Sequence, residues 1–293
     1  MQKILFYTFY IFSWFLSILP LKVQYIIADL LYLILYYIIS YRKKIVYINL
    51  KNSFPEKSKR ERKAIAKKFY KHLADLFIEN ITVHFISEKE ILKRVKFTNI
   101  EVLNNYYEQN KSVIAVLGHY GNWELYLGMP LISKHLIIGV YKKLTNKLFN
   151  NFFKKTRKKF GAVPVEMHQT VRTIIKYAKE KKLNFAGFIS DQTPTKSESH
   201  YWTKFLNQDT PIFLGVEKIA KKTNQPVVFL DMRKTKRGHY QVEIIKLFDN
   251  PKETKEFEIT ECHVKLLEKI IKEQPEYWLW SHRRWKHKKP NDK

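Results

Sequence analysis

The sequence predicts an α/β protein, a three-layer α/β/α sandwich around a mainly parallel sheet, preceded by an N-terminal apolar helical membrane anchor. Two long apolar runs within the first 41 residues predict the anchor. Short apolar runs that alternate with amphipathic, helix-like stretches predict the sandwich. A hydrophobic content of 45% and an aromatic content of 15% supply a core, which excludes a disordered polyelectrolyte despite the formal charge of +27.

Residues 1–41 form the predicted anchor of one or two helices, and residues 42–293 form the predicted globular domain. The run Ile4–Leu19 contains no charged residue, and extended to Leu21 it reaches the minimum of the ~17–25 residues that span a bilayer. The run Leu30–Tyr41 is shorter and is typical of a half-buried or interfacial helix. The number of crossings therefore stays open.

Basic residues follow the anchor at once, beginning with Arg42, Lys43 and Lys44. Such residues mark the cytoplasmic side of an apolar segment. A cleaved signal peptide is disfavoured because no small-residue cleavage site follows the first run. The other alternative to a membrane anchor is that the two apolar runs form a helix hairpin in the core of a soluble protein.

The charge is concentrated beyond residue 41, because the anchor holds only Lys3, Lys22 and Asp29 as charged residues. The excess of 54 Lys+Arg over 27 Asp+Glu predicts an acidic partner. The sequence has no zinc-finger spacing, RNA-recognition signature or basic zipper, so we expect anionic lipid rather than nucleic acid. Cys262 is the single cysteine, and the histidines show no ligand spacing, so we expect no disulfide, metal or cofactor.

The chain beyond the anchor begins with a long amphipathic helix over Glu56–Ile81. Five predicted strands follow, at Val113–Leu117, Leu136–Val140, Phe185–Ile189, Pro226–Leu230 and Tyr240–Ile245. Predicted helices occupy 122–133, 146–160, 168–182, 211–223 and 258–273. Thr210-Pro211 resembles a helix start, with a capping hydroxyl before a first-turn proline. In such folds the active site lies beyond the carboxyl ends of the strands.

The motif GHYGNWE, from Gly118 to Glu124, follows the first of these strands. We expect the loop to bring the Glu124 carboxylate to one nitrogen of the His119 ring, which leaves the other nitrogen free to accept a proton. Asn122 can cap the helix that follows, and Gly121 lets the backbone bend. The sequence thus predicts a base and a carboxylate that orients it.

The spacing alone is weak support, because His263 with Glu268 and His287 with Asp292 repeat it. The former pair lies within a predicted helix, where residues five apart do not share a face, and the latter lies in the polar tail. The strand, glycine and helix around His119 set that motif apart.

An ordered set of motifs gives the chain a resemblance to a known family. The set comprises Asn49-Leu50 with Ser53-Phe54-Pro55, GHYGNWE, Val140-Tyr141 with Arg157 and Gly161, Asp191-Gln192, Gly215 and Ala220 with Pro226-Val227-Val228, and Trp280–Lys286. It resembles the lipid A biosynthesis (late lauroyl/myristoyl) acyltransferase family, within the glycerolipid-type acyltransferases that share a His-x4-Asp/Glu motif. One departure is that Thr193-Pro194-Thr195-Lys196 replaces the acidic or glycine-containing stretch that follows Asp-Gln in many members.

The resemblance implies an acyltransferase domain at the cytoplasmic face of the inner membrane. It would move an acyl chain from acyl carrier protein to a hydroxyl of a lipid A precursor, without a covalent acyl-enzyme. In this scheme His119 is the general base and Glu124 holds its ring. Arg157, with Gly121 and Asn122, would bind the oxyanion or a phosphate. Asp191 and Gln192 would support the site, or Asp191 would only cap a turn.

Two basic regions have expected partners. A basic stretch docks carrier protein or phosphate, or is a solvated helix face; it comprises Lys142, Lys143, Lys147, Lys154, Lys155, Arg157, Lys158 and Lys159. The carboxyl-terminal residues Trp280, Arg283, Arg284 and Trp285 contact the membrane interface, or pack on the core. An acyltransferase for a lysophospholipid or aminolipid, and a basic lipid-binding protein without enzymatic activity, are the alternative functions.

Overall fold

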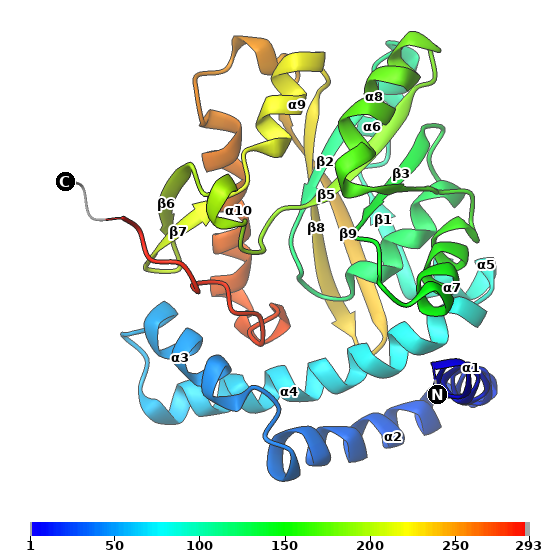
Figure 1. Ribbon diagram of the computed structural model, residues 1–293, viewed down its shortest axis with the longest axis vertical. Helices are drawn as coiled ribbons and strands as arrows, with labels where there is room; N and C mark the ends of the chain where they lie inside the picture. Colours follow the sequence, from blue (N-terminus) through cyan, green and yellow to red (C-terminus); the bar gives the residue numbers. More distant parts are fainter. Residues whose placement is uncertain (1, 291–293) are drawn as a thin grey trace.

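The computed structural model describes residues 2–290, and its centre is a seven-stranded sheet (Figure 1). The strands are β1 (Val95–Thr98), β2 (Val113–Leu117), β3 (Leu136–Tyr141), β4 (Val163–Glu166), β5 (Asn184–Ile189), β8 (Val227–Lys236) and β9 (His239–Phe248). Their order is β1-β9-β8-β2-β5-β3-β4, and every neighbouring pair is parallel except β8 with β9. The predicted fold class is confirmed.

Helices lie on both faces of the sheet and across one of its ends. They are α1 (Gln2–Ile18), α2 (Leu21–Leu33), α3 (Lys43–Ser53), α4 (Lys59–Thr82), α5 (Glu88–Arg94), α6 (Glu101–Glu108), α7 (Lys147–Lys158), α8 (Thr170–Lys179), α9 (Gly215–Thr223) and α10 (Glu258–Glu273). The long helix α4 crosses the end of the β8–β9 hairpin, and α1 and α2 lie beneath it (Figure 1).

The central strand β2 explains the three layers. All five of its residues are buried. Ile114 and Val116 pack in one core cluster with α9 and α10, whereas Val113, Ala115 and Leu117 pack in another with α5 and α6. Because successive side chains of a strand point to opposite faces, a continuous apolar run requires cover on both sides.

The predicted helix start at Thr210-Pro211 is wrong. These residues belong to β7 (Gln208–Ile212), which pairs antiparallel with β6 (Tyr201–Phe205), and α9 begins only at Gly215. The hairpin turns at Leu206 and Asn207, both with positive φ, which matches the twist of the two strands. Leucine is unusual in such a turn, so no local sequence pattern predicted the hairpin.

Pro20 separates the two N-terminal helices, because α1 ends at Ile18 and α2 begins at Leu21. Within residues 2–290, one stretch, Leu21–Ile38, is long and apolar enough to cross a membrane by length and composition. It joins α2 to the π-helical turn η1 (Ile34–Ile38). The sequence analysis favours the first apolar run as the membrane span. In the structure the break at Pro20 limits α1 to 17 residues, whereas the stretch Leu21–Ile38 has 18.

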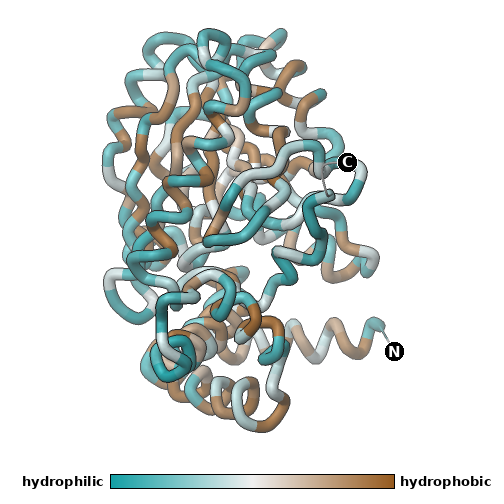
Figure 2. The backbone as a smooth tube through the Cα atoms, turned by 90° about the vertical axis from the view of Figure 1, so that its left-hand side faces the viewer, coloured by the Kyte–Doolittle hydropathy of each residue, from teal (hydrophilic) through white to brown (hydrophobic). Residues whose placement is uncertain are grey.

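Both N-terminal helices pack on the rest of the chain. α2 packs along α4, and Arg237 of the β8–β9 turn forms an ion pair with Asp29 of α2 at 2.8 Å. Phe6 and Phe9 of α1 contact Phe149 on α7. Many outward-facing side chains of both helices are large, apolar and exposed, and Figure 2 shows much of this layer in brown, the colour of hydrophobic residues. Both helices of the predicted anchor segment therefore pack on the rest of the fold.

The carboxyl-terminal segment packs on the core, so most of its expected contacts with lipid are wrong. Trp280 and Arg284 are fully buried, and Trp285 is half-buried with its indole N–H bonded to Thr210 at 2.7 Å. Of the four residues, only Arg283 is exposed. Asn49 of α3 donates to the carbonyl of Trp280 at 2.9 Å, which joins the first and last family-like motifs.

Candidate active site

His119 lies immediately beyond β2, at the carboxyl end of the parallel strands. Gly118 makes this position possible, because a Cβ at residue 118 would lie 2.7 Å from a methyl carbon of Leu267 and 3.4 Å from Asp191 Oδ2. Under such contacts a larger residue would push the loop outwards. The His119 side chain is 14% exposed, and its ring packs edge-on against Trp123.

The carboxylate that orients His119 belongs to Asp191, at the end of the neighbouring strand β5. Asp191 Oδ1 lies 2.5 Å from His119 Nδ1, and Oδ2 accepts the backbone N–H of His119 and the indole N–H of Trp278, each at 2.8 Å. Burial opposes ionisation of this group, but the charge of His119 and these donors outweigh it and lower the pKa of Asp191 to about 2. Asp191 is therefore a buried anion that fixes the ring.

The expected contact of Glu124 with the His119 ring is thus corrected. Glu124 lines the same pocket as His119, but its carboxylate lies 3.9 Å from Arg157 Nη2. It follows Asn122, whose side chain caps the 3₁₀ helix η3 (Trp123–Leu131) by accepting the Glu124 N–H at 3.2 Å. The strand-end position of Asp191 brings it to Nδ1, whereas the start of η3 turns Glu124 towards α7.

The second ring nitrogen of His119 contacts the loop that follows β5. The side-chain nitrogen of Gln192 lies 3.0 Å from His119 Nε2. With the Nδ1 proton directed to Asp191, Nε2 carries a lone pair and accepts from the Gln192 amide. This protonation pattern is the one that a general base requires.

Gly121 and Asn122 do not offer free amides to an oxyanion, in contrast to the expectation. The Gly121 N–H donates to the carbonyl of Tyr277 at 3.0 Å, and the Asn122 N–H is directed at Met232 Sδ at 3.1 Å. Gly121 has φ +62°, and Asn122 is fully buried. Both residues shape the loop from within. Arg157 remains at the pocket, where its guanidinium lies over the ring of Tyr141.

A pocket of about 360 Å³ lies beside His119. It passes between η3 and the ends of β2, β3 and β5, and its walls are mostly apolar, including Leu117, Ile137 and Phe185. Lys142 and Arg157 also line it. Its size falls in the usual range of ligand pockets, about 300–1,000 Å³. Residues 2–290 contain no group of three His, Cys, Asp or Glu side chains that could hold a metal ion.

One face of α4 carries a row of buried polar residues, His72, Asp75 and Glu79. They contact the β8–β9 hairpin and the loop of residues 118–122, which we call the catalytic loop because it carries His119. His72 Nε2 bonds the Gly121 carbonyl at 3.3 Å; burial and then the charge of Lys234 lower the pKa of His72 to about 3, so the ring is neutral. Asp75 forms ion pairs with Lys234 and Arg237.

Glu79 connects three separate elements. Its carboxylate accepts the Asn122 side-chain amide at 2.6 Å, the Tyr25 hydroxyl at 2.9 Å and the Tyr240 hydroxyl at 3.0 Å. These partners come from the catalytic loop, α2 and β9. Burial raises the pKa of Glu79, although the Asn122 hydrogen bond opposes the shift.

The sequence prediction missed this row and the role of Trp278. A signal for the row was present, since residues 72, 75 and 79 recur at helical spacing on the face that also carries Leu76. Polar residues on a buried helix face require partners elsewhere. The sequence contained no comparable signal for Trp278.

We expect Glu79→Ala to destabilise the fold by about 3–5 kcal/mol, because it leaves buried donors unpaired. Glu79→Gln should change stability by less than about 1 kcal/mol, since its oxygen can accept from Asn122 and Tyr240 while its amide donates to Tyr25. The raised pKa of Glu79 adds stability that is complete at acid pH and declines as pH rises. Chemical denaturation from pH 5 to 9 should show a flatter profile for Glu79→Gln, and a similar loss for both variants would contradict this account.

Comparisons with known proteins identify the family of the chain. A curated relative, the lipid A biosynthesis acyltransferase of Haemophilus influenzae, is 21% identical over 244 residues, which cover 79% of this chain and 72% of that protein. The family described as bacterial lipid A biosynthesis acyltransferase matches residues 1–287. A match over nearly the whole chain shows that this protein belongs to the bacterial lipid A biosynthesis acyltransferase family and is an acyltransferase of lipid A synthesis.

Proposed function

We propose that this acyltransferase moves a fatty acyl chain from the thioester of acyl carrier protein to a hydroxyl of a lipid A precursor. His119 acts as the general base in a direct transfer. The Asp191–His119 pair carries the proposal, because a carboxylate on Nδ1 leaves Nε2 able to accept a proton, and His119 lines an apolar pocket. In the reaction Nε2 takes the proton of the acceptor hydroxyl as its oxygen attacks the thioester carbonyl. The tetrahedral intermediate then collapses, and the thiolate leaves and takes up a proton.

The pocket beside His119 takes the donor acyl chain. Its inner walls are the buried residues Ile137, Phe185 and Leu230, and its outer end carries Lys142 and Arg157. An acyl chain can therefore enter with its thioester near His119. Arg157 and the Gln192 amide are the nearest side-chain donors for the developing oxyanion, and one such donor contributes about 3–4 kcal/mol to the transition state. Glu124 holds Arg157 in this position.

Basic residues surround the outer end of this pocket. Lys155 and Lys158 lie in the last turn of α7 near Arg157, and Lys142 follows β3. We propose that they dock acyl carrier protein, which is acidic. The attraction should weaken with salt because exposed charges are screened within about 10 Å at 0.1 M ionic strength.

The chain acts at the cytoplasmic face of the inner membrane. The exposed apolar side chains of α1, α2 and η1, among them Ile11, Phe15, Ile26 and Ile38, form a layer next to the end of the sheet that carries His119. Basic residues begin at Arg42, as on the cytoplasmic side of membrane segments. At this location the acyl chains of the substrates stay out of water. Exposing them to water would cost a free energy of about 0.8 kcal/mol per CH₂.

The substrate assignment is tested in cells that lack this protein. Mass spectrometry of their lipid A should show the loss of one acyl chain, restored by the wild-type gene but not by His119→Ala. A normal lipid A together with an altered phospholipid or aminolipid profile would reject the lipid A acceptor.

We expect His119→Ala to lower acyl transfer by the purified enzyme at least about 10²-fold, because the base is removed. The thermal midpoint should fall because Asp191 loses its ring partner, but the fold should be retained, since the backbone N–H of residue 119 and the Trp278 indole still donate to Asp191. His200→Ala, which removes an exposed histidine, is the matched control and should keep full activity. Turnover like that of wild type in His119→Ala would discard the mechanism.

We expect Asp191→Asn to lower kcat by about 10²–10⁴-fold with little change in KM, because the amide no longer fixes the Nδ1 proton. Asp209→Asn, at an exposed ion pair on the β6–β7 hairpin, controls for the lost charge. Because the pKa of Asp191 is about 2, its ionised form stabilises the fold fully above the ordinary aspartate range and loses this effect only as pH falls towards 2. A kcat of Asp191→Asn close to that of the wild type would contradict this role.

A further inference from the structure

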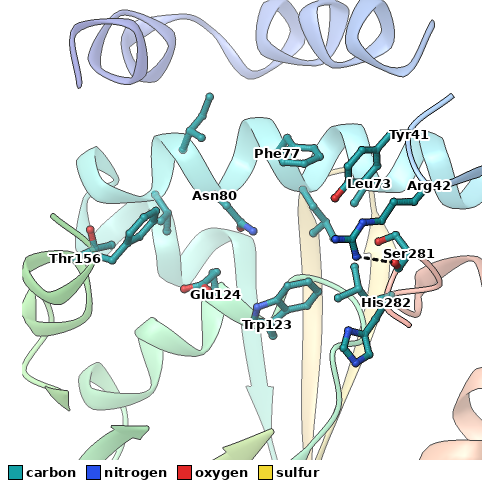
Figure 3. Close-up of a pocket in the computed structure, with 15 residues that line it drawn as sticks. Tyr41, Arg42, Leu73, Phe77, Asn80, Trp123, Glu124, Thr156, Ser281 and His282 are labelled. Atoms are coloured by element: carbon teal, nitrogen blue, oxygen red, sulfur yellow. Dashed lines mark hydrogen bonds between the residues drawn. The ribbon is translucent and has the colours of Figure 1, made fainter. Parts of the chain in front are cut away.

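A second cavity, of about 450 Å³, runs along α4 (Figure 3). Trp123 and Glu124 line both this cavity and the pocket beside His119, which we call the donor pocket, and the ring centroids of Trp123 and His119 lie 5.0 Å apart. We call this second cavity the α4 groove. Leu73, Leu76 and Phe77 form its apolar wall, and Phe77 is 43% exposed.

Two polar groups of the α4 groove are available to a ligand. Arg42 is exposed, donates one hydrogen bond, at 3.1 Å to the carbonyl of Ser281, and forms no ion pair with a carboxylate within residues 2–290. Its backbone is left-handed, with φ 48°, a conformation that costs a non-glycine residue energy. Asn80 points into the groove, and its Oδ1 is buried without a hydrogen-bond partner (Figure 3). A ligand with an anionic group and a hydrogen-bond donor would satisfy both.

The α4 groove differs from the donor pocket in what surrounds it. The donor pocket descends between η3 and the sheet, whereas the groove follows α4, which lies next to α2. It extends to Tyr41 and Arg42, where the anchor segment ends. A lipid that resides in the membrane can therefore reach the groove along α4 without crossing the sheet.

We propose that the α4 groove binds the acceptor lipid, with its hydroxyl-bearing acyl chain along α4 and a phosphate of its headgroup on Arg42. The inference rests on the proposed function and extends it, because it assigns the two substrate chains to separate cavities. The donor thioester approaches His119 from one side of Trp123, and the acceptor hydroxyl approaches from the other. Asn80 Oδ1 accepts a hydrogen bond from an amide N–H or a hydroxyl at the head of the acceptor chain.

Steady-state kinetics of Arg42→Ala tests the phosphate contact. With a phosphorylated acceptor we expect the acceptor KM to rise at least about 10-fold, the size of one charge-assisted hydrogen bond, with kcat and donor KM near wild type. With the same acceptor freed of phosphate, Arg42→Ala and wild type should have equal KM values. Lys44→Ala, the matched control, removes an exposed cation that does not line the groove and should behave as wild type. A rise in KM that is the same for both acceptors, or a rise in donor KM, would overturn the assignment.

Photocrosslinking separates the groove from the function proposed above. An acceptor with a diazirine in its acyl chain should label α4 peptides that contain Phe77, whereas a donor with a diazirine near its chain end should label β3 and β5. This readout needs no turnover. Wild-type enzyme that fails to acylate the acceptor would reject the proposed function, while labelling by the acceptor on β3 and β5 alone would reject the groove.

Discussion

The rest of the site depends on the hydrogen bonds that the buried carboxylate of Asp191 accepts. The carboxylate receives the His119 ring, the His119 backbone N–H and the Trp278 indole N–H. These donors come from the end of β2 and from the carboxyl-terminal segment, and they make ionisation favourable in a position where burial opposes it. A lone buried anion would be unstable, so the tail that brings Trp278 is part of the active site.

The carboxyl-terminal segment is therefore internal to the fold. Thr193, which follows the Asp-Gln pair, donates its hydroxyl to the Arg284 carbonyl at 2.7 Å, and its N–H lies 3.3 Å from His282 Nε2. The loop after Asp191 is thus fixed by the same segment that fixes Asp191 itself. This gives a structural role to Thr193, the first residue of the stretch that departs from the family pattern.

The polar row on α4 links the N-terminal helix α2 to the loop that carries His119. Glu79 contacts both Tyr25 of α2 and Asn122 of the loop, and Asp75 shares Arg237 with Asp29 of α2. In the proposed mechanism this link has a simple consequence. The same helix supports the loop that carries the base and forms the wall along which the acceptor enters. The orientation of the enzyme at the bilayer and the geometry of His119 are therefore set by one element.

The sequence alone determined the fold class, the five main strands, the apolar N-terminal segment and the position of His119 beyond β2. These features are local, because they follow from hydrophobic periodicity and from a glycine at a strand end. Only the tertiary structure decided which carboxylate reaches Nδ1, since Asp191 is 72 residues from His119 and becomes its neighbour through the parallel pairing of β2 with β5. It also decided that Trp280 and Arg284 are buried, and that two cavities share Trp123 as a lining residue, because contacts between distant segments have no local sequence signature.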